Sequence, residues 1–280
     1  MTDALRRALS AEALKLKRTL AVRMVFVAPA LLAALALFTQ AARLSRAGAK
    51  ASPFWDNHLQ QSLAIWAIFV LPLLVTLEAA LSSGLDHAER QWKHLFALPV
   101  PRPALYAAKL LTVHGLTLAS TLVACALVAL TGWGLTLWHP AAIHAGPPPL
   151  GALVGKALLA WLAAGLITSA HVWIATRWPS FTVAAGAGVA GTFFALFAAS
   201  AKAAKFYPWL LPVNTLASPD RRPVALALGI GGGLVVAVLG AVDFTRREEQ
   251  APPGLGRTAT IAWALLLAGL LAGAVWMQNA

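Results

Sequence analysis

Long apolar runs alternate with short polar stretches along most of the chain. An α-helix needs about 20 apolar residues to cross the hydrocarbon core of a membrane. Six runs have about that length, at residues 20–39, 61–83, 105–130, 153–176, 181–200 and 224–242, and a seventh run covers 258–276. A transmembrane barrel would instead show segments of about ten residues with strict alternation, which the sequence lacks. The pattern therefore predicts an all-α fold, a polytopic transmembrane helix bundle with six or seven spans. The stretches 40–60 and 201–223 between these runs are expected to be loops.

The residues before the first run predict an amphipathic helix over positions 1–19. Its leucines fall near one face and its charged residues lie elsewhere, with Leu5, Leu9, Leu16 and Leu20 on the apolar side and Arg6, Arg7, Glu12, Lys15, Lys17 and Arg18 away from it. Such a helix can lie in the headgroup plane of a membrane, although a solvated leader would carry the same charges. The chain then divides into an interfacial helix at 1–19, a six-span domain at 20–243, and a polar linker with the possible seventh span at 244–280.

Composition supports the membrane assignment. Hydrophobic residues make up 59% of the chain and charged residues 11%, against about 25% charged residues in a typical soluble domain. The net charge of +12 comes from Lys and Arg placed between the apolar runs and not from one basic stripe, so nucleic acid is not an expected partner. Lys and Arg are more numerous on the side of the N-terminus, and the positive-inside rule then places the N-terminus in the cytoplasm.

The segment from Gly151 to Lys156 superficially resembles a phosphate-binding loop. It has too few residues between its glycines, and Ala157 stands where a Ser or Thr should bind magnesium. We therefore expect that this chain does not hydrolyse ATP itself and binds no cofactor. Gly151 and Gly155 are four residues apart, which predicts close packing at the start of a helix.

Catalytic and metal sites are not expected. The seven histidines lack metal-ligand spacing. The single cysteine, Cys125, excludes an intramolecular disulfide and a thiolate cage and is expected to be a small core residue. Ser169 and His171 are two residues apart and project to different sides of a helix, so they do not form a nucleophile–base pair.

Two features inside the apolar runs each allow two interpretations. Glu78 is an acid within the second run, so it is either a functional intramembrane acid or a side chain that reaches the interface near Ser82 and Ser83. Small residues let helices approach closely, so the glycines of the fifth and sixth runs indicate either ordinary packing within the chain or a subunit interface. These glycines are Gly186, Gly188, Gly191, Gly229, Gly231, Gly232 and Gly233.

The polar stretch between the second and third runs predicts a short amphipathic helix that ends at Pro99. The stretch from Glu89 to Arg102, followed by Tyr106-Ala107-Ala108-Lys109, resembles the segment between spans two and three of the ABC type-2 permease family. That family includes bacitracin and lantibiotic self-protection permeases, and its members tend to open with a basic leader like that of residues 12–19. The resemblance covers the first 110 residues in motif detail and extends to about residue 243 by span layout alone.

This resemblance implies that the chain is one half of an exporter in the bacterial cytoplasmic (inner) membrane. A second copy or a sister permease would complete the pore, and a separate ABC ATPase dimer would bind ATP and magnesium. The segment at about 85–102 would be a coupling helix seated in the ATPase. Its implied contact residues are Asp86, Glu89, Arg90, Trp92, Lys93, Leu98, Pro99 and Arg102. The substrate would be an amphiphile such as an antimicrobial peptide, a lipid or a drug.

Two other functions remain as alternatives. An ion-coupled secondary transporter or channel would need several intramembrane ionisable residues, and Glu78 is the clearest one. A membrane-embedded enzyme would need a buried acid–base or metal cluster, which the sequence does not indicate. The possible seventh span also departs from family members that end soon after span six.

Overall fold

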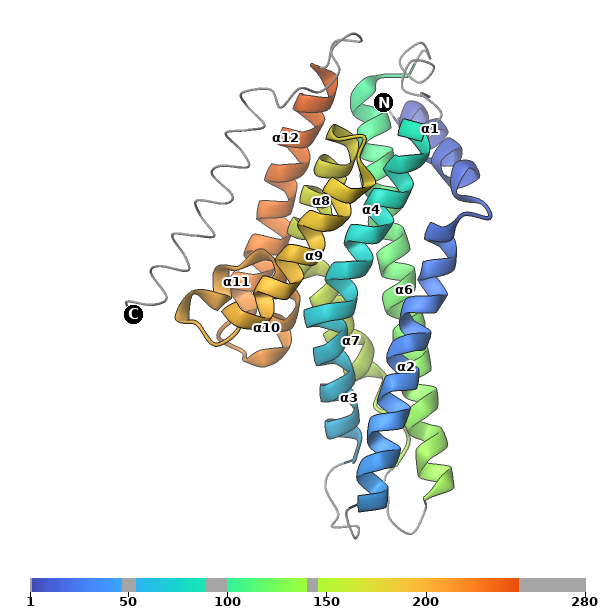
Figure 1. Ribbon diagram of the computed structural model, residues 1–280, viewed down its shortest axis with the longest axis vertical. Helices are drawn as coiled ribbons and strands as arrows, with labels where there is room; N and C mark the ends of the chain where they lie inside the picture. Colours follow the sequence, from blue (N-terminus) through green and yellow to red (C-terminus); the bar gives the residue numbers. More distant parts are fainter. Residues whose placement is uncertain (1, 47–53, 89–99, 140–145, 247–280) are drawn as a thin grey trace.

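The computed structural model describes residues 2–46, 54–88, 100–139 and 146–246. Within these ranges the chain is a helical bundle without strands, which confirms the predicted all-α class (Figure 1). Five helical segments are long and apolar enough to cross a membrane, and six are if one bent pair counts as a single span. The predicted seventh span, 258–276, and most of the linker before it lie outside the described residues.

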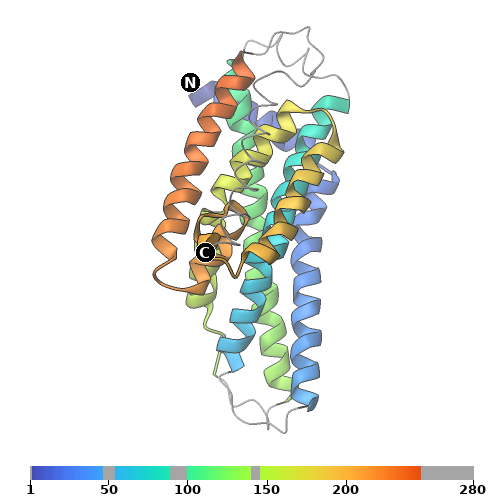
Figure 2. The same cartoon turned by 60° about the vertical axis from the view of Figure 1, so that its left-hand side comes forward.

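The helices follow the six predicted runs and are mostly longer than predicted. The spans are α2 (Leu20–Arg46); α3 (Phe54–Ile65) continued through the π-helical turn η1 (Trp66–Val70) into α4 (Leu71–Ala88); α6 (Arg102–Trp138); α7 (Leu150–Ala163) with α8 (Gly165–Arg177); α9 (Phe181–Ala198); and α11 (Arg222–Leu226) continued through the π-helical turn η4 (Ala227–Gly232) into α12 (Gly233–Thr245). An additional helix, α1 (Thr2–Leu16), precedes them. The helix α1, the last turn of α4, the first turn of α6 and the last turn of α12 lie at one end of the bundle, hereafter the α1 end (Figures 1 and 2).

Two predicted loops are partly helical. The polar stretch 40–60 was expected to be a loop, but α2 continues to Arg46 and α3 begins at Phe54. The amide of Gln40 donates to that of Gln61 at 3.2 Å, so polar side chains pair between the two helices. The stretch 201–223, also expected to be a loop, forms the short helices η2 (Lys202–Phe206), η3 (Pro208–Leu210) and α10 (Leu211–Ala217). It folds because Trp209, Leu210 and Leu211 are buried.

Breaks in the spans have local causes. Pro72 cannot donate a backbone hydrogen bond to the carbonyl four residues earlier, and the π-helical turn η1 ends two residues before it, at Val70. The helices α7 and α8 meet at an angle of 45° around Ala164. The π-helical turn η4 packs there, since a Cβ on Gly229 would lie 2.5 Å from the Cα of Ala163. These breaks bring the fourth and sixth spans into backbone contact.

For some of the glycines in the fifth and sixth runs, the structure confirms ordinary packing within the chain. Added side-chain atoms at Gly188 and Gly191 would collide with Thr76 and Trp209 of the same chain, as expected for packing within the chain. The expectation of close packing at Gly151 and Gly155 is wrong, because both are exposed and a Cβ on either would meet no atom within 4 Å. Spacing alone did not show that these two positions point outward from α7.

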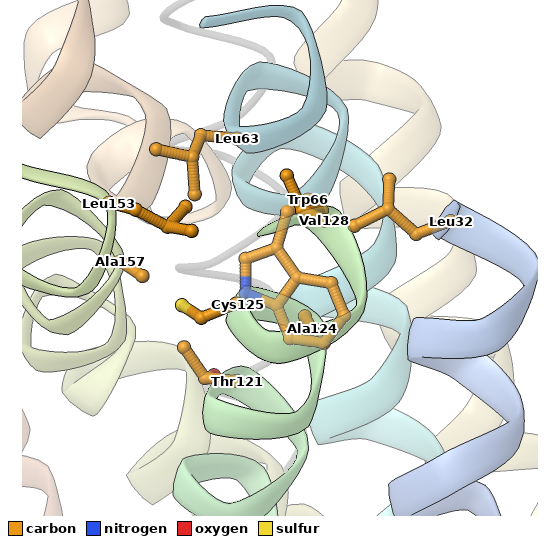
Figure 3. A pocket seen from close by; sticks show the side chains of 9 residues that line it. All are labelled: Leu32, Leu63, Trp66, Thr121, Ala124, Cys125, Val128, Leu153 and Ala157. Atoms are coloured by element: carbon orange, nitrogen blue, oxygen red, sulfur yellow. The ribbon is translucent and has the colours of Figure 1, made fainter. Parts of the chain in front are cut away.

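A small cavity of about 10 Å³, roughly the room that one water molecule needs, lies between α2, α3, α6 and α7 (Figure 3). Its lining is almost entirely apolar and includes Leu32, Leu63, Trp66, Val128 and Leu153. Cys125 is buried beside it, as expected for a core residue. Ligand pockets usually have about 300–1,000 Å³ and a few convergent polar groups, so this cavity is a packing defect and not a substrate site.

Candidate functional site

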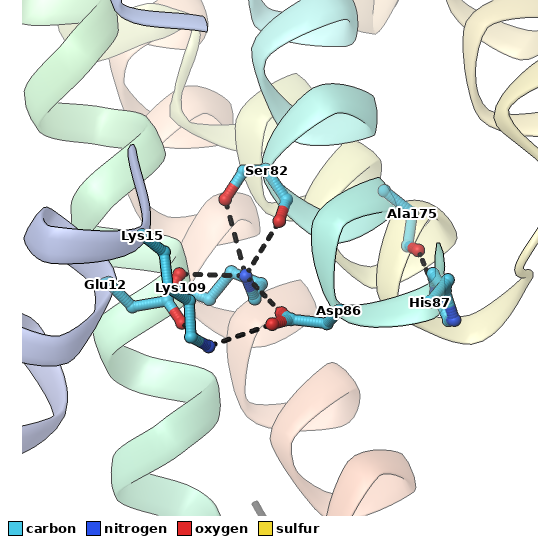
Figure 4. Close-up of polar contacts among 7 residues, drawn as sticks. All are labelled: Glu12, Lys15, Ser82, Asp86, His87, Lys109 and Ala175. Atoms are coloured by element: carbon cyan, nitrogen blue, oxygen red, sulfur yellow. Dashed lines mark hydrogen bonds and ion pairs between the residues drawn. The ribbon is translucent and has the colours of Figure 1, made fainter. Parts of the chain in front are cut away.

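A closed ring of four charged side chains joins three helices at the α1 end (Figure 4). Lys15 on α1 contacts Glu12 at 2.9 Å and Asp86 on α4 at 2.8 Å. Lys109 on α6 contacts the other oxygen of Glu12 at 2.8 Å and the other oxygen of Asp86 at 2.7 Å. Each carboxylate oxygen therefore faces one ammonium group. We call these four residues the ion-pair cluster.

The ion-pair cluster is electrically neutral and largely removed from solvent. The side chain of Asp86 is 0% exposed, that of Lys109 is 3% exposed and that of Lys15 is 20% exposed. Lys109 also donates to the backbone oxygen of Ser82 at 3.1 Å and lies 3.4 Å from its Oγ. Removing charges from water is costly, and the cost is recovered only when charges are paired and hydrogen-bonded with good geometry. Two acids and two bases in a closed ring meet that condition.

The pKa of Lys15, which lies outside the spans, reflects this balance. Burial alone would lower the pKa of its ammonium group, but the carboxylates of Glu12 and Asp86 outweigh burial and raise the pKa above its ordinary value. Lys15 therefore stays charged in the folded protein, and its attraction to both acids holds α1 against α4.

The orientation of α1 differs from the sequence expectation. Glu12 was expected to lie away from the buried face, but it is buried together with Ala4, Ala8 and Leu16, whereas Leu14 is 71% exposed. Asp86 and Lys109 provide the physical reason, because α4 and α6 present charges that only an inward-facing Glu12 and its neighbour Lys15 can complete.

Further polar contacts tie the helix ends together near the ion-pair cluster. Arg102, at the start of α6, donates to the backbone oxygen of Thr245 at the end of α12 at 3.2 Å. The ring of His87 on α4 lies 3.0 Å from the carbonyl oxygen of Ala175 on α8 (Figure 4). The ends of α4, α6, α8 and α12 are thus fixed relative to one another.

The structure places two of the predicted coupling residues. Asp86, which was expected to contact an ATPase, is fully buried and engaged by two lysines. Arg102 is half-buried and binds the end of α12. The other predicted contact residues, Glu89, Arg90, Trp92, Lys93, Leu98 and Pro99, lie outside the described residues.

Glu78 does not reach the interface. Its side chain is fully buried in α4, and neither carboxylate oxygen has a hydrogen-bond partner among the described residues. Ser82, which accepts from Lys109, is one helical turn away. Glu78 therefore remains an intramembrane acid that ordinary packing does not explain.

Sequence reasoning did not identify Glu12, Lys15 and Lys109 as site residues. The sequence did contain a signal for them. Lys109 falls inside the third apolar run, and Glu12, an acid in a basic leader, lies three residues before Lys15. Within the described residues, no group of three or more His, Cys, Asp or Glu side chains could hold a metal ion.

The bundle and its ion-pair cluster define a multi-pass membrane protein whose helix ends are held rigidly at one side. The family described as ABC-2 family transporter protein matches residues 8–195, which is well over half of the chain. This protein belongs to that family and is a membrane subunit of the ABC transporter class. The match begins within α1 and includes all four residues of the ion-pair cluster. No curated protein and no solved structure matches the chain.

Proposed function

We propose that this chain is the permease subunit of an exporter that uses ATP hydrolysed by a separate ATPase dimer. The N-terminus and residues 89–99 would face the cytoplasm of a bacterium, with the bundle in the inner membrane. The observation that carries this proposal is the ion-pair cluster, which joins α1, α4 and α6 directly beside the segment that connects the second and third spans.

The physical argument concerns how force passes from the ATPase to the spans. Residues 89–99 connect the end of α4 to the start of α6, so an ATPase that moves this segment acts on both helices. Asp86 and Lys109 are paired at 2.7 Å next to these helix ends, and α1 is fixed to both. A displacement of the segment would therefore move α1, α4 and α6 as one rigid body.

The proposed substrate is an amphiphile, such as an antimicrobial peptide, a lipid or a drug, that passes between this chain and a second permease. Large apolar side chains are exposed on the outer faces of α9 and α12, including Phe193, Phe197, Leu234 and Val238. The apolar cavity in the bundle is too small for such a molecule, which favours a route between two permease copies.

The decisive experiment tests association with the ATPase. Trp92→Ala combined with Glu89→Lys should leave membrane insertion intact and reduce co-purification of the ATPase. The matched control, Trp138→Ala with Asp56→Lys, changes one exposed tryptophan and one exposed acid near the other end of the bundle. Equal co-purification of both variants with the ATPase would refute the coupling assignment.

A labelling experiment tests the orientation separately. A cysteine introduced at Trp92 should react from the cytoplasmic side with a membrane-impermeant maleimide, and the buried Cys125 gives little background. Reaction from the outer side alone would place residue 92 beyond the reach of any cytoplasmic ATPase.

Glu78 supports a second candidate, an ion-coupled transporter, because it is a buried acid without a hydrogen-bond partner among the described residues. Glu78→Gln removes the ionisable group and nearly preserves shape. Substrate transport that depends on ATP and survives this change favours the exporter, whereas transport that needs an ion gradient and is lost in Glu78→Gln favours the alternative. A neighbouring reading frame with a Walker motif would further favour the exporter.

A further inference from the structure

A basic surface covers the outer side of α1 and the corner that joins it to α2. It consists of five exposed cationic residues, Arg6, Arg7, Lys17, Arg18 and Arg23. Among the described residues none of these five side chains forms an ion pair. Asp3 is also exposed on α1, whereas Glu12 faces inward in the ion-pair cluster. We call these five residues the basic corner, and its net charge is strongly positive.

The ion-pair cluster determines which residues α1 exposes. With Glu12 fixed inward, positions 6, 7, 10, 14 and 17 fall on the outward side of the helix, as their spacing of three or four residues requires. This outward side combines Arg6, Arg7 and Lys17 with Leu14, which is 71% exposed. Leu20, at the start of α2, is 47% exposed and continues the apolar surface.

The backbone at Arg18 carries an independent observation. Its φ is 67°, and within the described residues it is the one non-glycine position with positive φ. Glycine adopts this left-handed conformation without a steric cost, whereas arginine does not. A left-handed residue commonly ends a helix, and here it turns the chain from α1 towards α2 and leaves the Arg18 side chain exposed. Figure 1 shows this corner projecting from the side of the bundle.

We propose that the basic corner binds the anionic headgroups of phospholipids in the leaflet at the α1 end. Cationic side chains next to exposed leucines match a surface that is negative at the headgroups and apolar beneath them. Arginine forms paired hydrogen bonds to phosphate oxygens. The leucines then enter the outer part of the acyl region, and headgroup binding fixes the height of α1 and, through the ion-pair cluster, of α4 and α6.

This inference goes beyond the transport role and is tested without an ATPase. The full-length protein is purified in a neutral detergent, delipidated, and titrated with dioctanoyl phosphatidylglycerol or dioctanoyl phosphatidylcholine, with bound lipid measured by native mass spectrometry. Phosphatidylglycerol should bind more tightly than phosphatidylcholine. The variant Arg6→Gln/Arg7→Gln/Arg18→Gln should lose at least about fivefold in phosphatidylglycerol affinity, the effect of removing one cation at an anionic surface.

The matched control removes three exposed cations elsewhere, as Arg43→Gln/Lys156→Gln/Lys205→Gln, and should retain the wild-type affinity. Arg18→Gly separates binding from stability, because it relieves the backbone. It should keep or raise the thermal midpoint and still weaken phosphatidylglycerol binding.

Several outcomes would overturn the proposal. They are equal affinity for the two lipids, an equal loss of affinity in the control, and wild-type affinity in Arg18→Gly. Inorganic phosphate should not raise the thermal midpoint as much as phosphatidylglycerol does. An equal rise would show a general anion site and would also overturn the proposal. Unchanged lipid affinity in the triple variant together with lost ATPase co-purification would make the basic corner a protein contact.

Discussion

Replacing Lys109 by methionine tests the ion-pair cluster most directly. Methionine keeps much of the length and apolar volume of the lysine stem and removes the ammonium group that contacts Glu12 at 2.8 Å and Asp86 at 2.7 Å. Asp86 is fully buried, so the two carboxylates would share Lys15 alone and carry an uncompensated charge. Breaking a buried ion pair from one side costs about 3–5 kcal/mol.

The expected cost corresponds to a decrease of roughly 6–20 °C in the unfolding midpoint, at about 2–4 °C per kcal/mol for a chain of this size class. The midpoint can be followed by intrinsic fluorescence of the 11 tryptophans in detergent. The double variant Lys109→Met/Glu12→Gln removes one acid with the base and leaves a balanced Lys15–Asp86 pair, so it should recover part of the loss. The control Lys156→Met changes an exposed lysine on α7. A decrease in Lys109→Met no larger than in this control would refute the structural role of the cluster.

Three further predictions concern pH, helix contact and helix ends. The raised pKa of Lys15 contributes stability that is present below its ordinary pKa of 10.5 and is lost as pH rises through the pKa of the folded protein. Above about pH 10.5, the thermal midpoint should therefore fall more steeply with pH in the wild type than in Lys15→Met. Gly229→Ala should lower the free energy of unfolding by about 1–3 kcal/mol, because the added methyl group collides with Ala163. The control Gly186→Ala, whose Cβ meets no atom within 4 Å, should raise that free energy by about 0.5–1 kcal/mol. Equal changes in the two variants, measured by chemical denaturation, would refute this contact. Arg102→Met should cost about 1 kcal/mol, because the carboxyl end of α12 loses a charged donor, and hydrogen exchange should increase in the last turn of α12 and not in α9.

The spans could be predicted because hydrophobic length is a property of consecutive residues. An apolar run of sufficient length requires a membrane helix wherever its neighbours lie, so the six runs agree with the helices to within a few residues at most ends. The same reasoning failed at 40–60 and 201–223. Polar composition there suggested loops, but pairing of Gln40 with Gln61 and burial of Trp209 favour helices.

The candidate site was only partly predictable. The stretch at 85–102 was identified by its polarity and its resemblance to a family segment, and one of its residues, Asp86, belongs to the ion-pair cluster. Glu12, a buried member of the ion-pair cluster, was expected to lie away from the apolar face of α1. Its partner Lys109 is 97 residues away along the chain, and Lys15 is 71 residues from Asp86.

The sequence by itself therefore determined the class of fold, the positions of the apolar helices in the described part and the place of the polar connection between the second and third spans. The tertiary structure alone decided which side of α1 is buried, which glycines touch another helix, and which charges are neutralised. The physical reason is that crossing a membrane depends on the apolar length of one segment. The free energy of a buried charge depends instead on whether a distant helix brings an opposite charge within about 3 Å.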